Sequence, residues 1–234
     1  MKLSVIVPIF NEVATVEKVL RRVLAQPVPG VTGFEVVAVD DGSQDGTADI
    51  LNRLESELAG QIVLIRHDRN LGKGAAVRSA AARMTGDICI IQDADLEYDP
   101  SDYPLMLEPI IQGRADCVFG SRFTGTQAKR VLYFWHYVAN RVLTVVSDIF
   151  TNLNLTDMET GFKAFRVDVL KNIPIRSCRF GFEPEITAKV ARRRLRVYEV
   201  GISYSGRTYA EGKKITWVDG VKALVTIARY SFRD

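Results

Sequence analysis

Asp93 and Asp95 stand one residue apart, shortly after the apolar run 88–91, which is typical of a buried strand. Alternate side chains of an extended backbone point to the same side, so both carboxylates can face one ligand. Neighbouring carboxylates repel unless a cation lies between them. Hard divalent ions such as Mg²⁺ or Mn²⁺ suit them, especially when phosphate oxygens complete the shell. The pair therefore predicts a metal site, and a solvated loop is the alternative because such pairs are common.

The hydrophobic pattern predicts alternating strands and helices over the first 120 residues. Strands are expected at 4–9, 34–39, 62–65, 87–92 and 117–120, and helices at about 12–26, 50–58, 74–84 and 102–112. This alternation predicts an α/β fold, in which helices flank a mostly parallel sheet. Ligands of such sheets bind beyond the carboxyl ends of the strands. Polar residues follow those ends, and we expect them to line one cleft: Asn11, Glu12, Asp40, Asp41, Asn70, Lys73, Asp93, Asp95, Ser121 and Arg122.

The segment 131–150 breaks this alternation and is rich in large apolar side chains. Its polar positions recur at helical spacing and form a narrow stripe of His136, Asn140, Thr144, Ser147 and Asp148, bordered by Arg141. The wide apolar face of this predicted helix is either core or a face that lies on a membrane surface. Lys129 and Arg130, just before it, would suit anionic headgroups. Later strands are expected at 161–165 and 197–204, and later helices at 185–194 and 217–230.

Composition limits the possible function classes. The 234 residues are 47% hydrophobic and 25% charged, and the formal charge of +3 is too small to indicate a nucleic-acid partner. No apolar run approaches the roughly 18 residues that a membrane span needs. The first predicted strand directly follows the N-terminus, so no signal peptide is expected. Three scattered cysteines favour a reducing compartment, and we expect a cytoplasmic location.

Several nucleotide-binding motifs are absent from the sequence. A dinucleotide-binding domain should carry G-x-G-x-x-G after the first strand, where residues 8–12 read Pro-Ile-Phe-Asn-Glu. A P-loop needs G-x-x-x-x-G-K-[ST], and residues 72–75, Gly-Lys-Gly-Ala, lack both the spacing and the hydroxyl. A sugar nucleotidyltransferase would need a glycine-rich basic motif after the first strand. These three enzyme classes are therefore disfavoured.

Five motifs in order resemble glycosyltransferase family 2, whose members have the Rossmann-like GT-A fold. They are Val7-Pro8-Ile9-Phe10-Asn11-Glu12, Val39-Asp40-Asp41-Gly42-Ser43, Asn70-Leu71-Gly72-Lys73-Gly74, Asp93-Ala94-Asp95 and Gly120-Ser121-Arg122-Phe123. The later Thr160-Gly161-Phe162-Lys163, Gly206-Arg207 and Lys213-Lys214 are most similar to the branch that includes dolichyl-phosphate mannose synthase and bacterial polyprenyl-phosphate glycosyltransferases. The resemblance covers nearly the whole chain. It implies one GT-A domain over residues 1–234, with a nucleotide-sugar half at 1–122 and an acceptor half at 123–234.

The resemblance also implies roles for individual residues. A nucleoside diphosphate sugar, GDP-mannose or a UDP-sugar, would contact Pro8, Phe10, Glu12, Val39, Asp40, Asp41, Lys73, Asp93, Ala94, Arg207 and Lys213. Asp93, Asp95 and Glu97 would hold Mg²⁺ or Mn²⁺ on the diphosphate, although relatives often carry Gln at the third position. The implied catalytic residues are Asp95, Arg122 and Arg207, and the implied acceptor contacts are Arg122, Arg130 and Arg141.

The acceptor is argued from chemistry as well as from resemblance. A hydroxyl acceptor needs a general base, for which Asp157, Glu159, Glu183 and Glu185 are candidates. A lipid monophosphate, with a second pKa near ~6, is already largely ionised and needs none. The Q-x-x-R-W motif of processive relatives is absent.

We therefore expect a metal-dependent, inverting transfer to a polyprenyl or dolichyl phosphate. The protein would associate peripherally with the membrane, either directly or through a membrane-protein partner. A soluble transferase with a hydroxyl acceptor on a glycan or small molecule is the alternative enzyme. A non-catalytic regulator that binds sugar nucleotides is the alternative from another class.

Overall fold

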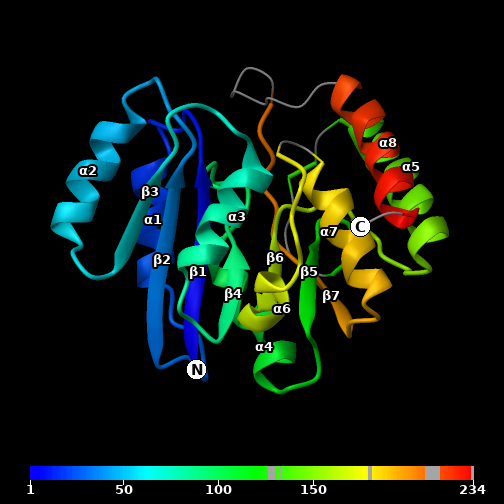
Figure 1. The fold of residues 1–234 in the computed structure, drawn as a ribbon, viewed down its shortest axis with the longest axis horizontal. Helices are drawn as coiled ribbons and strands as arrows, with labels where there is room; N and C mark the ends of the chain where they lie inside the picture. The colour runs from blue at the N-terminus through cyan, green and yellow to red at the C-terminus, as the bar shows by residue number, and fades with distance from the viewer. Residues whose placement is uncertain (126–129, 132, 179–180, 209–216, 233–234) are drawn as a thin grey trace.

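Seven strands form one sheet in the order β3-β2-β1-β4-β6-β5-β7 (Figure 1). The structure is a computed structural model that describes residues 1–125, 130–131, 133–178, 181–208 and 217–232. The strands are β1 Lys2–Ile9, β2 Gly33–Asp40, β3 Ile62–Arg66, β4 Ile88–Ile91, β5 Cys117–Ser121, β6 Lys163–Arg166 and β7 Val197–Gly201. Neighbouring strands are parallel except at β6, which is antiparallel to both β4 and β5. The predicted mostly parallel sheet is confirmed.

Helices cover both faces of the sheet, and α5 and α8 lie together at one side of the molecule (Figure 1). Their bounds are α1 Val16–Ala25, α2 Thr47–Glu57, α3 Lys73–Arg83, α4 Tyr103–Ile111, α5 Phe134–Thr151, α6 Val167–Lys171, α7 Phe182–Arg192 and α8 Trp217–Phe232, with a 3₁₀ turn, η1, at Pro100–Asp102. Alternate residues of β1 enter different cores because strand side chains alternate between faces. Val5 and Val7 pack with α1, α2 and α4, whereas Ile6 packs with α3, α6 and α7.

The first helix begins later than its hydrophobic pattern predicts. Asn11, just after β1, adopts a φ of 53°, and its side chain accepts a 2.8 Å hydrogen bond from the backbone N–H of Gln44. The carbonyl of Glu12 accepts the backbone N–H of Val16 at 2.9 Å. Residues 10–15 therefore form a loop at the carboxyl end of β1, and this loop borders the cleft expected from the sequence.

The last strand ends earlier than predicted, at Gly201. The backbone N–H of Ser203 donates to the carboxylate of Asp102 at 2.8 Å, and that of Ser205 donates to the carbonyl of Glu97 at 3.0 Å. These bonds draw the chain away from the β5 edge and towards the loop after β4. The residues that follow are thereby carried to the carboxyl end of β4.

Helix α5 buries its polar side and exposes its apolar side. Thr144 and Ser147 are buried, at 0% and 1% exposure, whereas Phe134, Trp135 and Ile149 are 65%, 75% and 74% exposed. The predicted helix is therefore confirmed. Leu143 and Val146 pack partly buried against the core, but most of the apolar face is exposed within the described structure, so the alternative that this whole face is core is wrong. No helix in the described part of the chain is long and apolar enough to cross a membrane.

Candidate active site

A buried glutamine shapes the loop that follows β4. The side-chain amide of Gln92 donates to two carbonyls of this loop at 3.0 and 3.2 Å, and its oxygen accepts the hydroxyl of Tyr103 at 3.0 Å. Ala94 is buried, and its carbonyl accepts a hydrogen bond from a threonine of the β1 loop at 2.7 Å. The loop thereby presents Asp93 and Asp95 at the carboxyl edge of the sheet.

Asp93 forms an ion pair with Lys73, the first residue of α3, at 2.8 Å. The Lys73 ammonium also lies 3.0 Å from Oε1 of Glu183. Burial opposes the ammonium charge, but the carboxylates of Asp93 and Glu183 outweigh it and raise the pKa of Lys73. A Cβ on Gly161 would lie 2.7 Å from Lys73 Nζ and would collide with the Asp93 carboxylate, so a larger residue there would displace this ion pair.

Arg207 lies among three carboxylates. Its Nη2 is 2.8 Å from Asp95, its Nη1 is 3.4 Å from Glu12, and its backbone N–H donates to Glu97 at 2.9 Å. Burial opposes the guanidinium charge, but these carboxylates raise the pKa of Arg207 above its usual value. Burial, followed by the negative charges of Asp93 and Glu97, raises the pKa of Asp95 to about 7. The carboxylates of Glu12, Asp95 and Glu97 thus outnumber the single guanidinium that they surround.

The two aspartates fit a hard divalent cation. Burial and the neighbouring carboxylates destabilise the charged form of Asp95, and a bound cation relieves both effects. Mg²⁺ is commonly held by one or two carboxylates together with substrate phosphates. Glu97, predicted as a third ligand, accepts the hydroxyl of Tyr204 at 2.9 Å as well as Arg207. Within the described residues, no group of three or more His, Cys, Asp or Glu side chains is arranged to hold a metal.

The predicted nucleotide-binding residues gather where β1 and β2 end. Pro8 of β1 pairs with Val39 of β2, and the next register position brings in Asp40. Asp40 is 3% exposed and accepts a backbone N–H of the following turn at 3.0 Å. Phe10 and Glu12 lie in the adjoining loop. Contact of these residues with a nucleotide stays a prediction.

Asp41, which follows Asp40 directly after β2, binds the loop that precedes α3. One oxygen lies 2.7 Å from His67 Nδ1 and accepts the N–H of Leu71 at 2.9 Å, and the other accepts the N–H of Gly72 at 2.7 Å. These bonds fix the position of Lys73, the next residue. The structure thus shows a positioning contact for Asp41, and its predicted nucleotide contact stays a prediction.

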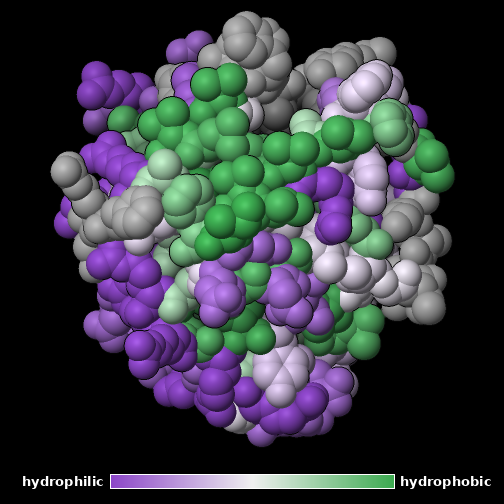
Figure 2. Space-filling view, turned by 90° about the vertical axis from the view of Figure 1, so that its right-hand side faces the viewer, coloured by the Kyte–Doolittle hydropathy of each residue, from purple (hydrophilic) through white to green (hydrophobic). Residues whose placement is uncertain are grey.

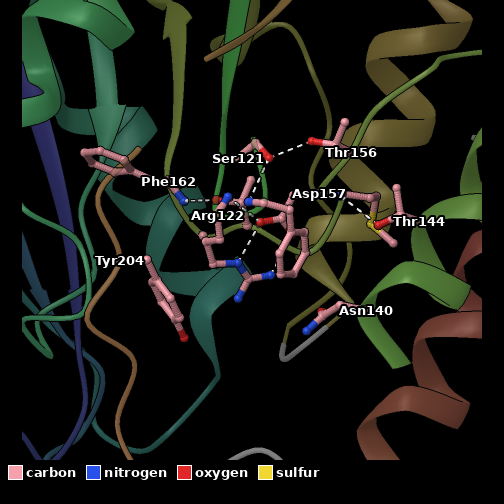
Figure 3. Close-up of polar contacts among 12 residues, drawn as sticks. Ser121, Arg122, Asn140, Thr144, Thr156, Asp157, Phe162 and Tyr204 are labelled. Atoms are coloured by element: carbon pink, nitrogen blue, oxygen red, sulfur yellow. Dashed lines mark hydrogen bonds and ion pairs between the residues drawn. The ribbon is translucent and has the colours of Figure 1, made fainter. Parts of the chain in front are cut away.

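Arg122, just after β5, forms a bidentate ion pair with the buried Asp157 (Figure 3). The Nε and Nη2 atoms of Arg122 lie 2.6 and 2.7 Å from the two carboxylate oxygens, and its backbone N–H donates to Asp157 at 3.0 Å. The rings of Tyr204 and Phe123 lie 5.3 and 5.5 Å from the guanidinium carbon. Such a forked pair fixes the plane of the guanidinium.

Tyr204 touches both groups of predicted functional residues. Its hydroxyl binds Glu97, beside Arg207 and Asp95, while its ring lies against Arg122. The predicted donor-side and acceptor-side residues therefore border one region beyond the carboxyl ends of β4 and β5.

Two further predicted acceptor residues bind backbone carbonyls. Arg130 donates to Gly206 at 3.2 Å, and Arg141 of α5 donates to Thr156 at 3.1 Å. Contact of Arg130 and Arg141 with an acceptor stays a prediction. Lys213, predicted to contact the diphosphate, lies outside the described residues.

The four candidate general bases have different surroundings. Asp157, Glu183 and Glu185 are each held by a basic side chain. Burial and then the charge of Glu183 raise the pKa of Glu159 to about 8, and its buried Oε1 has no hydrogen-bond partner within the described structure. A carboxyl that is mostly protonated at neutral pH is a poor general base. Each of the four carboxyl groups is therefore either paired with a basic side chain or mostly protonated at neutral pH.

Sequence reasoning missed Tyr204 and Glu199. Tyr204 lies beyond a strand end and belongs to no motif. Glu199 of β7 accepts the backbone N–H and the hydroxyl of Thr156, both at 2.8 Å, and so supports the segment that carries Asp157. An acid within an otherwise apolar strand was the only available signal for Glu199.

Comparison with known proteins identifies the family. The model of the family described as Glycosyl transferase family 2 matches residues 4–174. The chain belongs to glycosyltransferase family 2. Undecaprenyl-phosphate 4-deoxy-4-formamido-L-arabinose transferases of Pseudomonas aeruginosa and Edwardsiella ictaluri are each 28% identical to it over 90% of its length. This family-2 chain spans 59% and 62% of those two relatives.

Solved structures confirm the GT-A fold of this family-2 member. Glucosyl-3-phosphoglycerate synthase from Mycobacterium tuberculosis, in complex with Mn²⁺, UDP and phosphoglyceric acid, aligns with a TM-score of 0.74 at 18% identity, covering 100% of this chain and 79% of that one. The same synthase with Mg²⁺ and UDP aligns with a TM-score of 0.72 at 19% identity, covering 100% and 80%. At this identity the likeness concerns the fold.

Proposed function

We propose that this domain transfers a sugar from a nucleoside diphosphate sugar, GDP-mannose or a UDP-sugar, to the phosphate of a polyprenyl lipid, with inversion at the anomeric carbon. The observation that carries the proposal is the position of Tyr204, which touches Glu97 on the donor side and Arg122 on the acceptor side. The similarity to undecaprenyl-phosphate transferases supports the choice of lipid phosphate.

On the donor side, Asp93 and Asp95 would hold Mg²⁺ or Mn²⁺, and solved GT-A structures with these ions support that assignment. The cation would help neutralise the diphosphate. Arg207, now paired with Asp95 at 2.8 Å, would turn to the diphosphate and stabilise the charge that develops as the sugar departs. Lys73 would offer a second positive charge nearby.

On the acceptor side, Arg122 would bind the lipid phosphate while Asp157 holds its guanidinium plane. A phosphate oxygen would attack the anomeric carbon, the bond from that carbon to the diphosphate oxygen would break, and the nucleoside diphosphate would leave. No proton has to be removed from an already ionised phosphate. The absence of a proton to remove is consistent with the candidate bases, of which three are paired with basic side chains and Glu159 is mostly protonated at neutral pH.

The exposed side of α5 and α8 supports action at a membrane surface. Figure 2 shows this side of the molecule, with a hydrophobic band above a hydrophilic area. We define the outer apolar face as Phe134, Trp135, Val142, Val145, Ile149, Phe150, Val221, Leu224 and Val225, all exposed. Exposed basic residues on or next to these helices include Arg130, Lys222 and Arg229. Apolar area with nearby positive charge suits peripheral binding to anionic lipid.

Product analysis tests the proposed reaction. The protein is incubated with a panel of sugar nucleotides, Mn²⁺ and vesicles that contain undecaprenyl phosphate, and the products are partitioned between organic solvent and water. We expect the sugar to appear in the organic phase as a phosphodiester. Sugar found only in a new aqueous product would favour the hydroxyl acceptor. Nucleotide binding without turnover of any donor would favour the regulator.

A further inference from the structure

The buried side of α5 is unusual because it is polar. Helices of globular proteins normally bury an apolar stripe, and buried polar groups need hydrogen-bond partners. Thr144 is fully buried, and Arg141 and Asp148 are half-buried on the same side of the helix. Their spacing places them on successive turns of one helix face. The partners of these three side chains therefore show what the inner face of α5 does.

All three side chains bind the backbone of the segment 155–158. Thr144 Oγ1 accepts the N–H of Met158 at 3.2 Å, Asp148 accepts the N–H of Leu155 at 3.3 Å, and Arg141 donates to the carbonyl of Thr156 at 3.1 Å. This segment contains no helix or strand of its own. Its shape consequently depends on outside partners.

The other two backbone N–H groups of this segment donate hydrogen bonds to Glu199 of β7. Glu199 accepts the N–H of Thr156 at 2.8 Å and that of Asp157 at 3.2 Å. Four consecutive backbone N–H groups, from residue 155 to residue 158, are thus each bound by a side chain of α5 or β7. Side chains of α5 on one side and of β7 on the other therefore fix the backbone of segment 155–158.

Asp157 projects from this segment to Arg122. Its carboxylate is fully buried and receives three hydrogen bonds from Arg122, at 2.6, 2.7 and 3.0 Å. Figure 3 shows Arg122 next to Asp157, with Tyr204 on the opposite side of the guanidinium from Thr144. A displacement of the segment would therefore move the carboxylate that orients this guanidinium.

We propose that Arg141, Thr144 and Asp148 are positioning residues, which fix the segment 155–158 so that Asp157 aims Arg122 at the acceptor phosphate. The inference rests on the proposed role of Arg122. It assigns α5 two faces with separate tasks. The outer apolar face docks on lipid, and the inner polar face sets the orientation of the phosphate-binding arginine. One rigid helix thereby fixes where Arg122 lies relative to the lipid surface.

Binding of farnesyl phosphate, a short polyprenyl phosphate, tests this inference by calorimetry without any sugar donor. Farnesol serves as the phosphate-free probe. Thr144→Val removes the acceptor for the Met158 N–H at similar volume, and we expect farnesyl phosphate to bind about tenfold more weakly while farnesol binding is unchanged. Thr144→Ser keeps the hydroxyl and should restore the affinity. Thr151→Ala, which loses a 2.8 Å bond to the Ser147 carbonyl and a 3.4 Å bond from the Leu153 N–H but none to the segment 155–158, is the matched control.

Arg122→Gln separates the failure of this inference from the failure of the proposed function. Unchanged affinity for farnesyl phosphate in Arg122→Gln would refute the proposed acceptor role. A loss in Arg122→Gln without one in Thr144→Val would overturn the positioning role, as would an equal loss for farnesyl phosphate and farnesol. Asp148→Leu, at a half-buried site, replaces Thr144→Val if that variant does not fold, with Asp148→Asn, which keeps an acceptor oxygen, as its conservative partner.

Discussion

The hydroxyl of Tyr204 donates a 2.9 Å hydrogen bond to the carboxylate of Glu97, although 107 positions separate the two residues. The same carboxylate accepts the backbone N–H of Arg207 at 2.9 Å. Glu97 thus ties the chain that leaves β7 to the loop after β4. In this arrangement Glu97 orders Arg207, which the sequence resemblance placed on the diphosphate.

Tyr204→Phe should slow transfer without unfolding the protein. The substitution removes one hydrogen bond to a carboxylate but keeps the ring that lies 5.3 Å from Arg122. Loss of about 1 kcal/mol in the ordering of Arg207 predicts a fall in kcat/KM of about five- to tenfold. Steady-state kinetics of sugar transfer measure it, and Tyr198→Phe, at an exposed ring on β7, is the control. Equal kcat/KM for Tyr204→Phe and the wild type would show that the bond is unimportant for the reaction.

Asp95→Ala should abolish Mn²⁺-dependent binding of the nucleotide and reduce transfer by at least about 100-fold. The fold should survive, because Asp95 is a half-buried carboxylate whose charge is destabilised by burial, Asp93 and Glu97, which raise its pKa to about 7, and its removal relieves this repulsion. Arg207 would still contact Glu12 and Glu97. Calorimetry with UDP and with GDP, each with and without Mn²⁺, measures the effect.

Asp49→Asn, an exposed change in the first turn of α2, controls for the loss of one negative charge. Metal-dependent nucleotide binding that persists in Asp95→Ala would refute the assignment of Asp95 as a ligand. A lowered thermal midpoint with normal binding would instead give this aspartate a structural role.

The sequence predicted the parts of the fold that depend on local pattern. The runs that form β1 and β2 are mostly apolar, that of β4 is wholly apolar, and all three are followed by polar motifs. Both the strands and the placement of Asp93 and Asp95 could therefore be read directly. The antiparallel position of β6 could not, because Lys163–Arg166 is short and its pairing with β4 and β5 is non-local. The direction of the α5 faces was also open, since amphipathicity shows that two faces differ but not which one turns inward.

The candidate site also contains some residues that local sequence pattern predicts and others that only tertiary contacts bring into place. Asp93, Asp95 and Arg122 stand at strand ends and carry motif signals. Tyr204 reaches the site only because Ser203 and Ser205 leave the sheet through bonds to residues about a hundred positions away. Such contacts are fixed by tertiary packing, and no periodicity in the sequence encodes them.

Stability should depend on Glu35 in a defined acidic range. Burial opposes the charge of this carboxylate, but hydrogen bonds from Lys2, Ser4 and Thr85 lower its pKa from 4.5 to about 2. A depressed folded-state pKa stabilises the protein above the unfolded-state value, and this stabilisation is lost as pH falls through the folded-state value. Glu35→Gln should therefore cost about 1–2 kcal/mol near pH 7. The difference from wild type should shrink between about pH 4.5 and pH 2, as measured by urea unfolding.

Glu108→Gln, at an exposed position of α4, is the control for that measurement. Its free energy of unfolding should follow the wild-type pH dependence. A difference between Glu35→Gln and wild type that stays constant down to pH 2 would contradict the ion-pair and hydrogen-bond account of Glu35.

Membrane binding should depend on the outer apolar face rather than on exposed apolar residues in general. Trp135 is 75% exposed at the start of α5, and insertion of its ring into the lipid interface would remove a large apolar area from water. Trp135→Glu should weaken binding to anionic vesicles by at least about tenfold, since it removes this area and adds a charge that the vesicles repel. Vesicle co-sedimentation measures it, with Leu105→Glu, at a 41% exposed position of α4, as the control. Equal losses in both variants would point to charge alone, and no binding by the wild type would favour docking through a membrane-protein partner.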